Sequence, residues 1–580
     1  MSWQPHFGRL ALVVISVTLA LGASNSVHAS TDSSSNRLVT TAWLAEHRAD
    51  EGLIIIDARP TPEYLAGHIP NAVSVSFDQS LGTSNGRDVS YGGGFDLLAD
   101  NKGAIAFQDG ARQDIERALR KLGVGADSKL IIYDAGAHFH ASRFFYTLES
   151  HGFDNARVLD GGFMKWRAEG RDQSTEVPQP AAGDVVLSAP RGDLAANTDD
   201  VLQALGDHSS KVITSLTPDW HYGLHLAYSR PGHIPHATLV PMIYFFNPDG
   251  TWRSKAQLAA LLEVSGIGPD EPLITYCGGS PLSACSYFTF KHVLGRPKVR
   301  VYEGALLSWL ADKRDLGVHT YQHPEMLRDS DWIQWWAGER IQRLLMDPPA
   351  VVVDVRPAAA YAEGHIPWSV NIPMDEVTST SVADWARTLG AHGVGNSTEV
   401  VLCDDGLTPK LAAGFWLLEY MGHAQVSICS DGLAGWNARY GLTQKDTLIA
   451  APTHPRFDVA IHPTTFTPVE QPRKRLTDAD GATFHRAFPR VWVVSSNTVP
   501  ADLPISKFVH LPWSTAMFNG PGALKSAGTL WQTFDQAGAS YFDEVVCTGE
   551  TVGDAAMCYL ALRLLGYPTV RLYVPAKAAL

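Results

Sequence analysis

One cysteine lies where the chain is well suited to form a thiolate. Cys277 directly follows a short apolar run, Leu273 to Tyr276, and precedes a glycine-rich segment that leads into a predicted helix. A thiol at a strand end and above a helix N-terminus faces backbone N–H groups and the positive end of the helix dipole, which together favour the thiolate. We therefore predict that Cys277 is a nucleophile. The same N–H groups would stabilise a terminal sulfur that carries negative charge.

The segment after Cys277 is expected to surround the bound substrate. Gly278 and Gly279 follow the strand directly, and two glycines there are what a loop that folds over a reactive atom requires. Ser280 and Ser283 either donate hydrogen bonds to the sulfur compound or cap the following helix, and both roles stay open at this point. The predicted substrate-binding residues of this segment are Gly278, Gly279, Ser280, Leu282 and Ser283.

A repeat with fixed spacing positions this cysteine. A glycine falls 18 residues and a tryptophan 32 residues after each of three positions, which we call anchors. The three sets are Asp134, Gly152 and Trp166; Cys277, Gly295 and Trp309; and Asp404, Gly422 and Trp436. Each anchor ends an apolar run and opens a helix-like segment, so the unit is strand, loop and helix. Such alternation predicts an α/β fold of parallel strands flanked by helices, with ligands at the carboxyl ends of the strands.

The repeats divide the chain into four predicted domains. Repeats 1, 2 and 3 cover residues 37–175, 190–314 and 325–445, and a weaker repeat 4 covers residues 478–580 after a linker at 446–477 that is rich in Pro, Thr and His. Counting 18 residues back from Gly566 places Thr548 at the anchor of repeat 4. Four domains agree with the length of 580 residues, since one hydrophobic core does not extend that far.

Composition and the N-terminus predict an exported protein. The net charge of -14 argues against nucleic acid and anionic membrane surfaces as partners, because both attract clustered Lys and Arg. His6 and Arg9 precede an apolar stretch from Leu10 to Ala23, and a small-x-small site ends at Ala29. This order is typical of a secretory signal, here residues 1–29, so we expect a periplasmic or secreted product with no membrane attachment after cleavage. An uncleaved anchor is the alternative.

Neither a disulfide framework nor a metal site is predicted. The six cysteines show no CxxC spacing, and Cys403, Cys429 and Cys547 lie in apolar runs where a buried thiol acts as a small hydrophobic group. No Cys/His cluster has the spacing of zinc ligands. We expect no cofactor and no metal.

The chain resembles the rhodanese family of sulfurtransferases over nearly its whole mature length. The resemblance rests on Gly-His-Ile-Pro at residues 67–70, 232–235 and 364–367, on the anchors, and on the closing segments Asp160 to Trp166 and Glu303 to Trp309. Repeats 1 and 2 are similar to tandem thiosulfate or mercaptopyruvate sulfurtransferases, whose first domain is silent with Asp in place of Cys. The resemblance implies that Cys277 takes a sulfane sulfur from a donor such as thiosulfate, becomes a persulfide, and passes the sulfur to cyanide or another thiophilic acceptor.

The same resemblance implies which repeats and partners take part. Asp134, Asp404 and Thr548 make repeats 1, 3 and 4 silent. The partners are a small sulfur-containing substrate and a thiol or protein that accepts the sulfur. The cleft between repeats 1 and 2 is expected to complete the pocket.

Two departures from the family pattern bear on the substrate. The loop after Cys277 looks one residue longer than in tandem members, because Ala284 falls one position later. Leu216 replaces the arginine that usually ends the first strand of the active domain and helps to hold an anionic donor. Arg230 matches a basic position of some members and is the predicted substitute. Mercaptopyruvate, whose carboxylate depends on paired arginines, becomes less attractive.

Two other functions compete with sulfur transfer. Cysteine phosphatases of related architecture place an arginine after a five-residue loop, but position 283 is Ser and no guanidinium follows to hold a phosphate. A periplasmic protein that binds sulfur compounds or a partner without catalysis is the second alternative, supported by the missing cysteine in three of four repeats. His68, His233 and His365 are expected to hold their turns by ring hydrogen bonds rather than to act as bases.

Overall fold

The computed structural model describes most of the chain. The described residues are 37–75, 83–84, 87–88, 112–225, 229–338, 350–375, 377, 379–444, 457–461, 466–467, 488–501, 503, 505–519 and 523–573. The predicted signal at residues 1–29 and most of the predicted linker at 446–477 lie outside them. Within the described ranges, no helix is long and apolar enough to cross a lipid bilayer.

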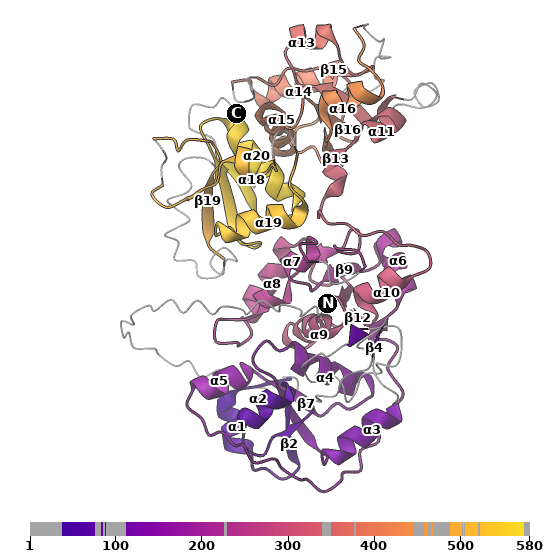
Figure 1. The fold of residues 1–580 in the computed structure, drawn as a ribbon, viewed down its shortest axis with the longest axis vertical. Coiled ribbons are helices and arrows are strands. Elements are labelled where there is room, and N and C mark those ends of the chain that lie inside the picture. The colour runs from indigo at the N-terminus through magenta and orange to yellow at the C-terminus, as the bar shows by residue number, and fades with distance from the viewer. Residues whose placement is uncertain are drawn as a thin grey trace. The chain divides into compact units, whose positions relative to one another are not determined.

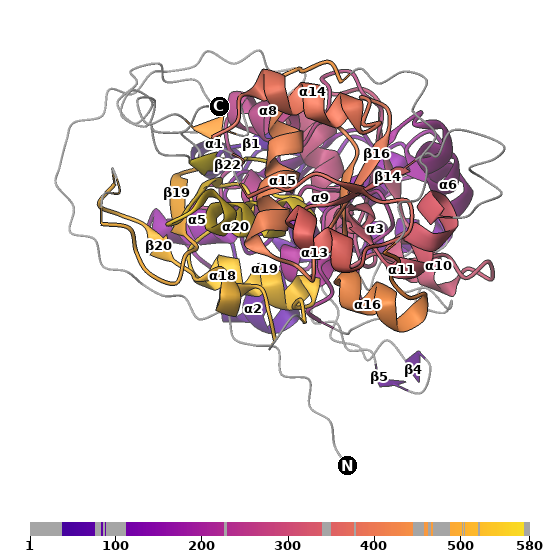
Figure 2. The ribbon, with the colours of Figure 1, turned by 90° about the horizontal axis from the view of Figure 1, so that it is seen from above.

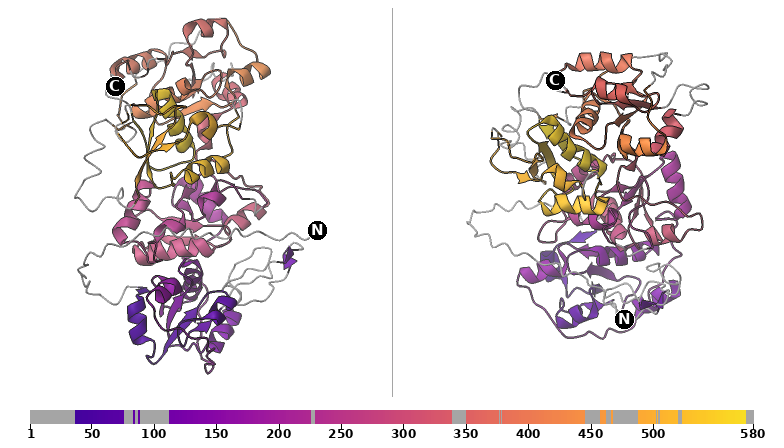
Figure 3. Two further views of the ribbon diagram at one scale, coloured as in Figure 1. Left: turned by 60° about the vertical axis from the view of Figure 1, so that its left-hand side comes forward. Right: turned by 45° about the horizontal axis from the view of Figure 1, so that its top comes forward.

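Four five-stranded sheets are present, and each has the same strand order with all neighbours parallel. In repeat 1 the order is β1-β7-β6-β2-β3, so the strand before the anchor, β6, lies at the centre. Helices cover the sheets, as Figure 1 and the turned views of Figure 3 show for the indigo repeat 1. The predicted fold class, four rhodanese-like domains that each contain a parallel sheet flanked by helices, is confirmed.

The elements of the first two repeats are as follows. Repeat 1 contains β1 (Leu38–Val39), α1 (Thr41–His47), β2 (Leu53–Asp57), α2 (Thr61–Ala66), β3 (Val73–Ser74), α3 (Arg112–Lys121), β6 (Lys129–Tyr133), α4 (Phe139–Ser150), β7 (Ala156–Leu159) and α5 (Gly162–Ala168), and an antiparallel pair, β4 (Thr83–Ser84) with β5 (Arg87–Asp88), labelled in Figure 2. Repeat 2 contains β8 (Ala195–Ala196), α6 (Thr198–Asp207), β9 (Lys211–Thr214), α7 (Pro218–His221), β10 (Thr238–Leu239), the 3₁₀ helix η1 (Met242–Phe245), α8 (Lys255–Val264), β11 (Leu273–Tyr276), α9 (Pro281–Phe288), the π-helix η2 (Thr289–Val293), β12 (Val299–Tyr302) and α10 (Ala305–Ala311).

The other two repeats follow the same plan. Repeat 3 contains η3 (Pro324–Met326), β13 (Leu327–Arg328), α11 (Ser330–Ile333), η4 (Gln334–Gly338), β14 (Ala350–Asp354), α13 (Ala358–Glu363), β15 (Val370–Asn371), α14 (Val382–Ala391), β16 (Glu399–Cys403), α15 (Pro409–Tyr420), β17 (Val426–Cys429) and α16 (Gly432–Arg439). Repeat 4 contains β18 (Phe466–Thr467), β19 (Arg490–Val494), β20 (Val509–His510), α18 (Trp513–Ala516), α19 (Ala527–Gln536), β21 (Glu544–Thr548), α20 (Val552–Leu564) and β22 (Val570–Tyr573). Strand β18 comes from the stretch expected to be a linker, and it pairs with β22.

The fixed spacing of glycine and tryptophan has a structural cause. Gly152, Gly295, Gly422 and Gly566 all adopt left-handed backbone angles, with φ of 78°, 82°, 93° and 73°, just after the helix that follows the anchor. Glycine takes this conformation without a steric penalty, so it ends the helix in every repeat. The tryptophans are buried, and their Nε1 groups donate to the carbonyls of Asp172, Gly317 and Gly441.

Strand register corrects the predicted anchor of repeat 4. The residue before each anchor accepts a hydrogen bond from the chain after the neighbouring central strand, and these residues are Tyr133, Tyr276, Cys403 and Thr548. Thr548 therefore matches Tyr276, and Gly549 matches Cys277. The prediction of Thr548 was wrong by one residue, because the loop and helix of repeat 4 are one residue shorter than the constant count of 18 assumed. Repeat 4 carries no thiol at its anchor.

The helix after each anchor also joins the repeats in pairs. Helix α4 of repeat 1 packs against α9 of repeat 2, and α15 of repeat 3 packs against α20 of repeat 4. Ring contacts such as Phe145 with Phe288, with centroids 4.9 Å apart and nearly perpendicular planes, fill the first of these interfaces. Edge-to-face pairs of this kind add stabilisation beyond buried area. The chain thus contains two tandem pairs.

A buried carboxylate is bound in the same way in both pairs. Glu149 accepts hydrogen bonds from Tyr287 Oη at 2.9 Å and from His292 Nε2 at 2.8 Å, and Lys291 Nζ lies 3.7 Å away. In the second pair, Glu419 accepts from Tyr559 Oη at 2.6 Å and from Arg563 at 3.0 and 3.1 Å. Tyr287 and Tyr559 both stand 10 residues after their anchors, and Glu149 and Glu419 both stand 15 residues after theirs.

We predict that Glu149→Gln destabilises the chain by about 3 kcal/mol, because a buried cation and a hydroxyl lose their charged acceptor. Burial alone would raise the pKa of Glu149, but the hydrogen bond from His292 and the charges of His292 and Lys291 lower it to about 2. A depressed carboxyl pKa adds stability above the unfolded value, so this contribution is lost as pH falls from about 4.5 to about 2.

Denaturant unfolding followed across this pH range measures the effect. Glu149→Gln should flatten the acid-dependent part of the stability curve, and Glu116→Gln, on the surface helix α3, is the matched control. An unchanged curve for Glu149→Gln would contradict the assignment.

Candidate active site

Cys277 leaves β11 at the carboxyl edge of the central sheet of repeat 2. Its residue is 2% exposed, and it belongs to a cluster with Leu216, Ile234 and Leu306. The Cys277 carbonyl accepts from Leu306 N at 3.0 Å, and the Gly278 carbonyl accepts from Leu307 N at 3.2 Å. These bonds fix the loop to the start of α10. The predicted nucleophile thus sits on a loop that is held at both its strand end and its neighbouring helix.

The loop between Cys277 and α9 is short. Helix α9 begins at Pro281, in the first helical turn, where a missing N–H costs no intrahelical bond. The residue that precedes the helix follows the anchor by three positions in repeat 2 and by four in repeats 1 and 3, where these residues are His138 and Thr408. The expectation of a longer loop is therefore wrong. The additional residue lies in the helix, where the π-helical turn η2 accommodates it before Gly295.

The two serines of the loop have different surroundings. Ser283 Oγ donates to the Ser280 carbonyl at 2.7 Å, so its hydroxyl holds the first turn of α9. Ser280 has a φ of 87°, and its side chain does not cap the helix. Its Oγ is buried and makes no hydrogen bond with the described residues. Of the two open roles, capping is thus excluded for Ser280, and its hydroxyl is available to a bound sulfur compound.

The anchor of repeat 1 shows what such a loop binds. One carboxylate oxygen of Asp134 accepts from the backbone N–H groups of Gly136 at 2.9 Å and His138 at 3.0 Å. The other accepts from His140 N at 3.1 Å and Ala141 N at 3.3 Å. Four N–H groups at a helix N-terminus thus converge on a negative charge. In repeat 3, Asp404 accepts instead from Asp405 N and from the Thr408 hydroxyl.

The silent anchor of repeat 1 is covered by a turn of repeat 2. His138 Nε2 lies 2.6 Å from the Gly250 carbonyl, and Trp252 N donates to Asp160 at 2.9 Å. A Cβ at Gly250 would lie 2.9 Å from Met164 Cε, so only glycine allows this approach. Repeat 1 therefore contributes a closed, filled loop rather than a second site.

The charges beneath the anchor differ between the silent and the active repeats. In repeat 1, Arg59 forms a buried ion pair with Asp57 at 2.6 Å, and Tyr133 Oη donates to the same carboxylate. Repeat 3 has the equivalent pair, Arg356 and Asp354, at 2.8 Å. Repeat 2 has Thr214 and Leu216 in these places, since Thr214 pairs with Tyr276 as Asp57 pairs with Tyr133.

The environment beneath Cys277 is therefore uncharged at these two positions. Burial raises the pKa of the Tyr276 hydroxyl, which keeps it neutral, and this hydroxyl accepts from Ile234 N at 3.0 Å. No carboxylate at position 214 opposes a negative sulfur, and no guanidinium at position 216 attracts an anionic donor.

Arg230, the predicted substitute, is engaged elsewhere. Its guanidinium donates to the Leu316 carbonyl at 2.9 Å and lies 3.2 Å from the Asp315 carboxylate. Leu282 packs partly buried against the cluster that contains Cys277. The three histidines hold their turns: the Nδ1 groups of His68, His233 and His365 each lie 2.9 Å from the carbonyls of Tyr64, His221 and Tyr361, as expected.

Comparison with known proteins agrees with this geometry. A model of the rhodanese-like domain matches residues 40–169, 198–312 and 338–439, which is more than half of the chain. The chain belongs to the rhodanese family of sulfurtransferases.

Several relatives of this rhodanese-family chain match its first half. The sulfur carrier protein TtuD of Thermus thermophilus is 27% identical over 47% of this chain and 93% of its own length. The putative thiosulfate sulfurtransferase SseA of Mycobacterium tuberculosis is 29% identical over 47% of this chain and 87% of its own length. A solved structure of SseA from Escherichia coli, described as a 3-mercaptopyruvate sulfotransferase, is 27% identical over 47% of this chain and 98% of that chain, with a TM-score of 0.40.

Metal chemistry finds no candidate residues in the described part of the chain, which contains no group of three or more His, Cys, Asp or Glu side chains arranged to hold an ion.

The filled loop of repeat 1 gives a prediction for stability. Asp134→Ala leaves four N–H groups without their charged acceptor and should lower the free energy of unfolding by about 3 kcal/mol. Asp404→Ala is the matched variant, and a smaller loss is expected because Asp404 accepts from one N–H group and one hydroxyl. Chemical denaturation of both variants measures the difference. Equal losses would show that the four N–H groups are not what Asp134 stabilises.

Proposed function

We propose that this chain transfers a sulfane sulfur through a persulfide on Cys277, from a donor such as thiosulfate to cyanide or another thiophilic acceptor. The observation that carries the proposal is positional. Cys277 occupies the place where Asp134 of the sister repeat gathers four backbone N–H groups around a negative charge. The names of the matched relatives, which include sulfurtransferases, support the same reaction class.

The reaction needs two displacements at sulfur. The Cys277 thiolate attacks the outer sulfur of the donor, the S–S bond of the donor breaks, and the electron pair leaves with the rest of the donor, as sulfite when the donor is thiosulfate. The acceptor then attacks the terminal sulfur of the persulfide, and the pair of the new S–S bond returns to Cys277 as thiolate. No net oxidation of the protein occurs.

The surrounding residues have distinct tasks in this scheme. Backbone N–H groups of Gly278 and Gly279 and the start of α9 lie next to the thiolate and favour negative charge there. The unpartnered Ser280 hydroxyl is the side-chain donor for the terminal sulfur. Leu282 and Leu216 keep the site apolar, which strengthens these electrostatic interactions because water is excluded.

The neutral residues beneath the anchor bear on the donor. Leu216 cannot pair with a carboxylate, and Arg230 is held by Asp315 and the Leu316 carbonyl. A donor that depends on two arginines, such as mercaptopyruvate, is therefore less suited to this site than thiosulfate or a polysulfide.

A non-catalytic role in binding sulfur compounds or a partner is the second candidate. It is supported by the filled or missing anchors of repeats 1, 3 and 4, which are Asp134, Asp404 and Gly549. The tests below separate the two, since binding alone leaves no turnover.

We further propose export of the chain to the periplasm or the medium, followed by cleavage after Ala29. The apolar stretch from Leu10 to Ala23 and the small residues before Ser30 support it. The intact mass of the protein from the periplasmic fraction should correspond to residues 30–580. A mature product that still contains Leu10 to Ala23 would overturn the proposal.

For the chemistry, we predict that Cys277 is the cysteine that gains sulfur when the protein meets thiosulfate or polysulfide. Peptide mass spectrometry should find one added sulfur atom there, and Cys277→Ser should lose turnover with cyanide by at least about 1,000-fold, the scale expected when a nucleophile is removed. Cys285→Ser is the matched control, because Cys285 is buried in α9 and burial raises the pKa of its thiol. Added sulfur on another cysteine, or full turnover by Cys277→Ser, would show that the active repeat is wrongly assigned.

A further inference from the structure

Two cysteines outside the proposed active site lie next to each other in repeat 4. The Sγ atoms of Cys547, in β21, and Cys558, in α20, are 2.9 Å apart. A disulfide bond measures about 2.05 Å, so the two atoms stand less than about 1 Å beyond bonding distance. Both thiols belong to the core, with exposures of 0% and 2%.

The local fold holds the two residues in this position. Helix α20 begins with a capping box in which Thr551 accepts from Asp554 N and Asp554 accepts from Thr551 N. The Asp554 carbonyl accepts from Ser495 Oγ at 2.6 Å, which ties the first turn of α20 to the chain after β19. The helix therefore returns over the sheet with a fixed start, and its second turn brings Cys558 onto Cys547.

We propose that Cys547 and Cys558 form a disulfide within repeat 4 under oxidising conditions. The two thiols lose two protons and two electrons, and one S–S bond forms. The oxidant is another disulfide, such as glutathione disulfide, which is reduced to two thiols by exchange through a mixed disulfide. This inference is independent of the reaction at Cys277.

Burial determines when the bond forms. Burial, with the neighbouring Cys558 second, raises the pKa of the Cys547 thiol, so the folded core itself offers little thiolate for exchange. Exchange therefore takes place while repeat 4 folds, or in local openings in which α20 leaves β21. Once formed, the bond is shielded from reductants by the same core. An exported chain meets oxidising conditions of this kind during folding.

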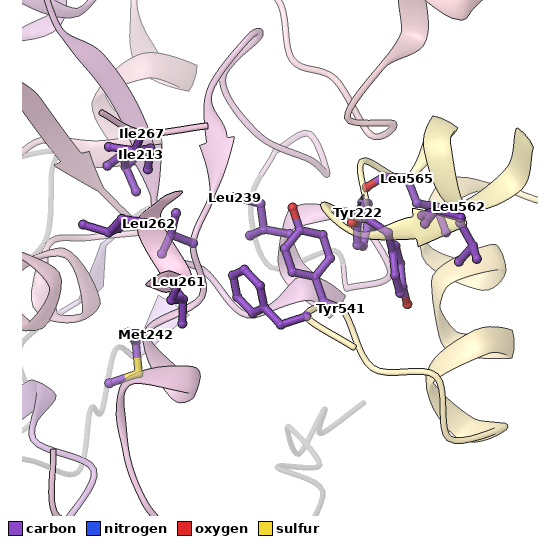
Figure 4. Close-up of a cluster of buried hydrophobic side chains, with 14 of the residues drawn as sticks. Ile213, Tyr222, Leu239, Met242, Leu261, Leu262, Ile267, Tyr541, Leu562 and Leu565 are labelled. Atoms are coloured by element: carbon purple, nitrogen blue, oxygen red, sulfur yellow. Dashed lines mark hydrogen bonds between the residues drawn. The ribbon is translucent and has the colours of Figure 1, made fainter. Parts of the chain in front are cut away.

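The bond would fix the helix on which two other contacts depend. Helix α20 carries Tyr559 and Arg563, which bind Glu419 of repeat 3. Leu565, just after α20, accepts through its carbonyl from the Tyr222 hydroxyl of repeat 2, and Figure 4 shows these residues together in one apolar cluster with Tyr541 and Leu239. Fixing α20 to β21 thus steadies repeat 4 at its contacts with two other repeats.

The remaining cysteines are less suited to form a bond. Cys403 and Cys429 are neighbours at the ends of adjacent parallel strands, β16 and β17, and Cys429 Sγ is directed to Asp431 at 3.6 Å. Cys277 and Cys285 lie in the loop and helix of repeat 2, eight residues apart. The Cys403 and Cys429 pair is the rival outcome of the test.

The test uses the full chain, free of sulfur donors. One sample is unfolded and refolded with a mixture of reduced and oxidised glutathione, and a second with a phosphine reductant. Both are then alkylated in denaturant. The oxidised sample should take up four alkyl groups and the reduced sample six, as the chain has six cysteines. Non-reducing peptide mapping should find the peptide of Cys547 joined to that of Cys558.

Two variants sharpen the result. Cys558→Ala should keep five alkylatable thiols after oxidation, whereas the control Cys429→Ala should keep three, because its Cys547 to Cys558 bond still forms. The oxidised wild-type chain should also unfold at a temperature several degrees above the reduced chain, and this difference should vanish in Cys558→Ala. Six free thiols in the oxidised wild type, or a bond between Cys403 and Cys429 in place of this one, would overturn the proposal.

Discussion

The helix that follows each anchor is the element on which both the site and the assembly depend. Its N-terminus supplies the N–H groups that surround the anchor, as four such groups surround Asp134. Its side packs against the equivalent helix of the next repeat, α4 against α9 and α15 against α20. One helix must therefore satisfy two demands, and its direction is set by the carboxyl end of the central strand at one end and a left-handed glycine at the other.

These two demands separate when a repeat loses its chemistry. Asp134 fills the loop of repeat 1 with a carboxylate, and repeat 2 covers it, yet α4 keeps Glu149 for the interface. Repeats 3 and 4 repeat this arrangement through Glu419, Tyr559 and Arg563, although Cys277 has no counterpart in either. The buried carboxylate explains why: without it, the hydroxyl and the cation that face it would remain buried without an acceptor. The interface is retained on physical grounds that do not involve the active site.

The sequence predicted the elements with strict local requirements. The glycine at the helix end needs a positive φ and the tryptophan needs a carbonyl for Nε1, so both keep their spacing, and they revealed the repeat, the sheet and the position of Cys277. The loop length has no such requirement. It differs by one residue between repeats, and the count therefore placed the last anchor at Thr548 instead of Gly549. The glutamates 15 residues after two anchors were a usable signal, whereas the closeness of Cys547 and Cys558 depends on how a strand, a turn and a helix fold back.

Gly549 shows why repeat 4 could not regain the chemistry by one substitution. A Cβ at this position would lie 2.7 Å from Asp554 Cβ, closer than carbon atoms in proteins approach. Asp554 cannot move freely, because its carboxylate completes the capping box of α20 and accepts from Trp513 Nε1 at 2.9 Å. A cysteine at residue 549 would therefore displace the start of the helix whose N–H groups a persulfide needs. Repeat 2 escapes this conflict because Ser280 and Pro281 begin α9 one residue further from the anchor.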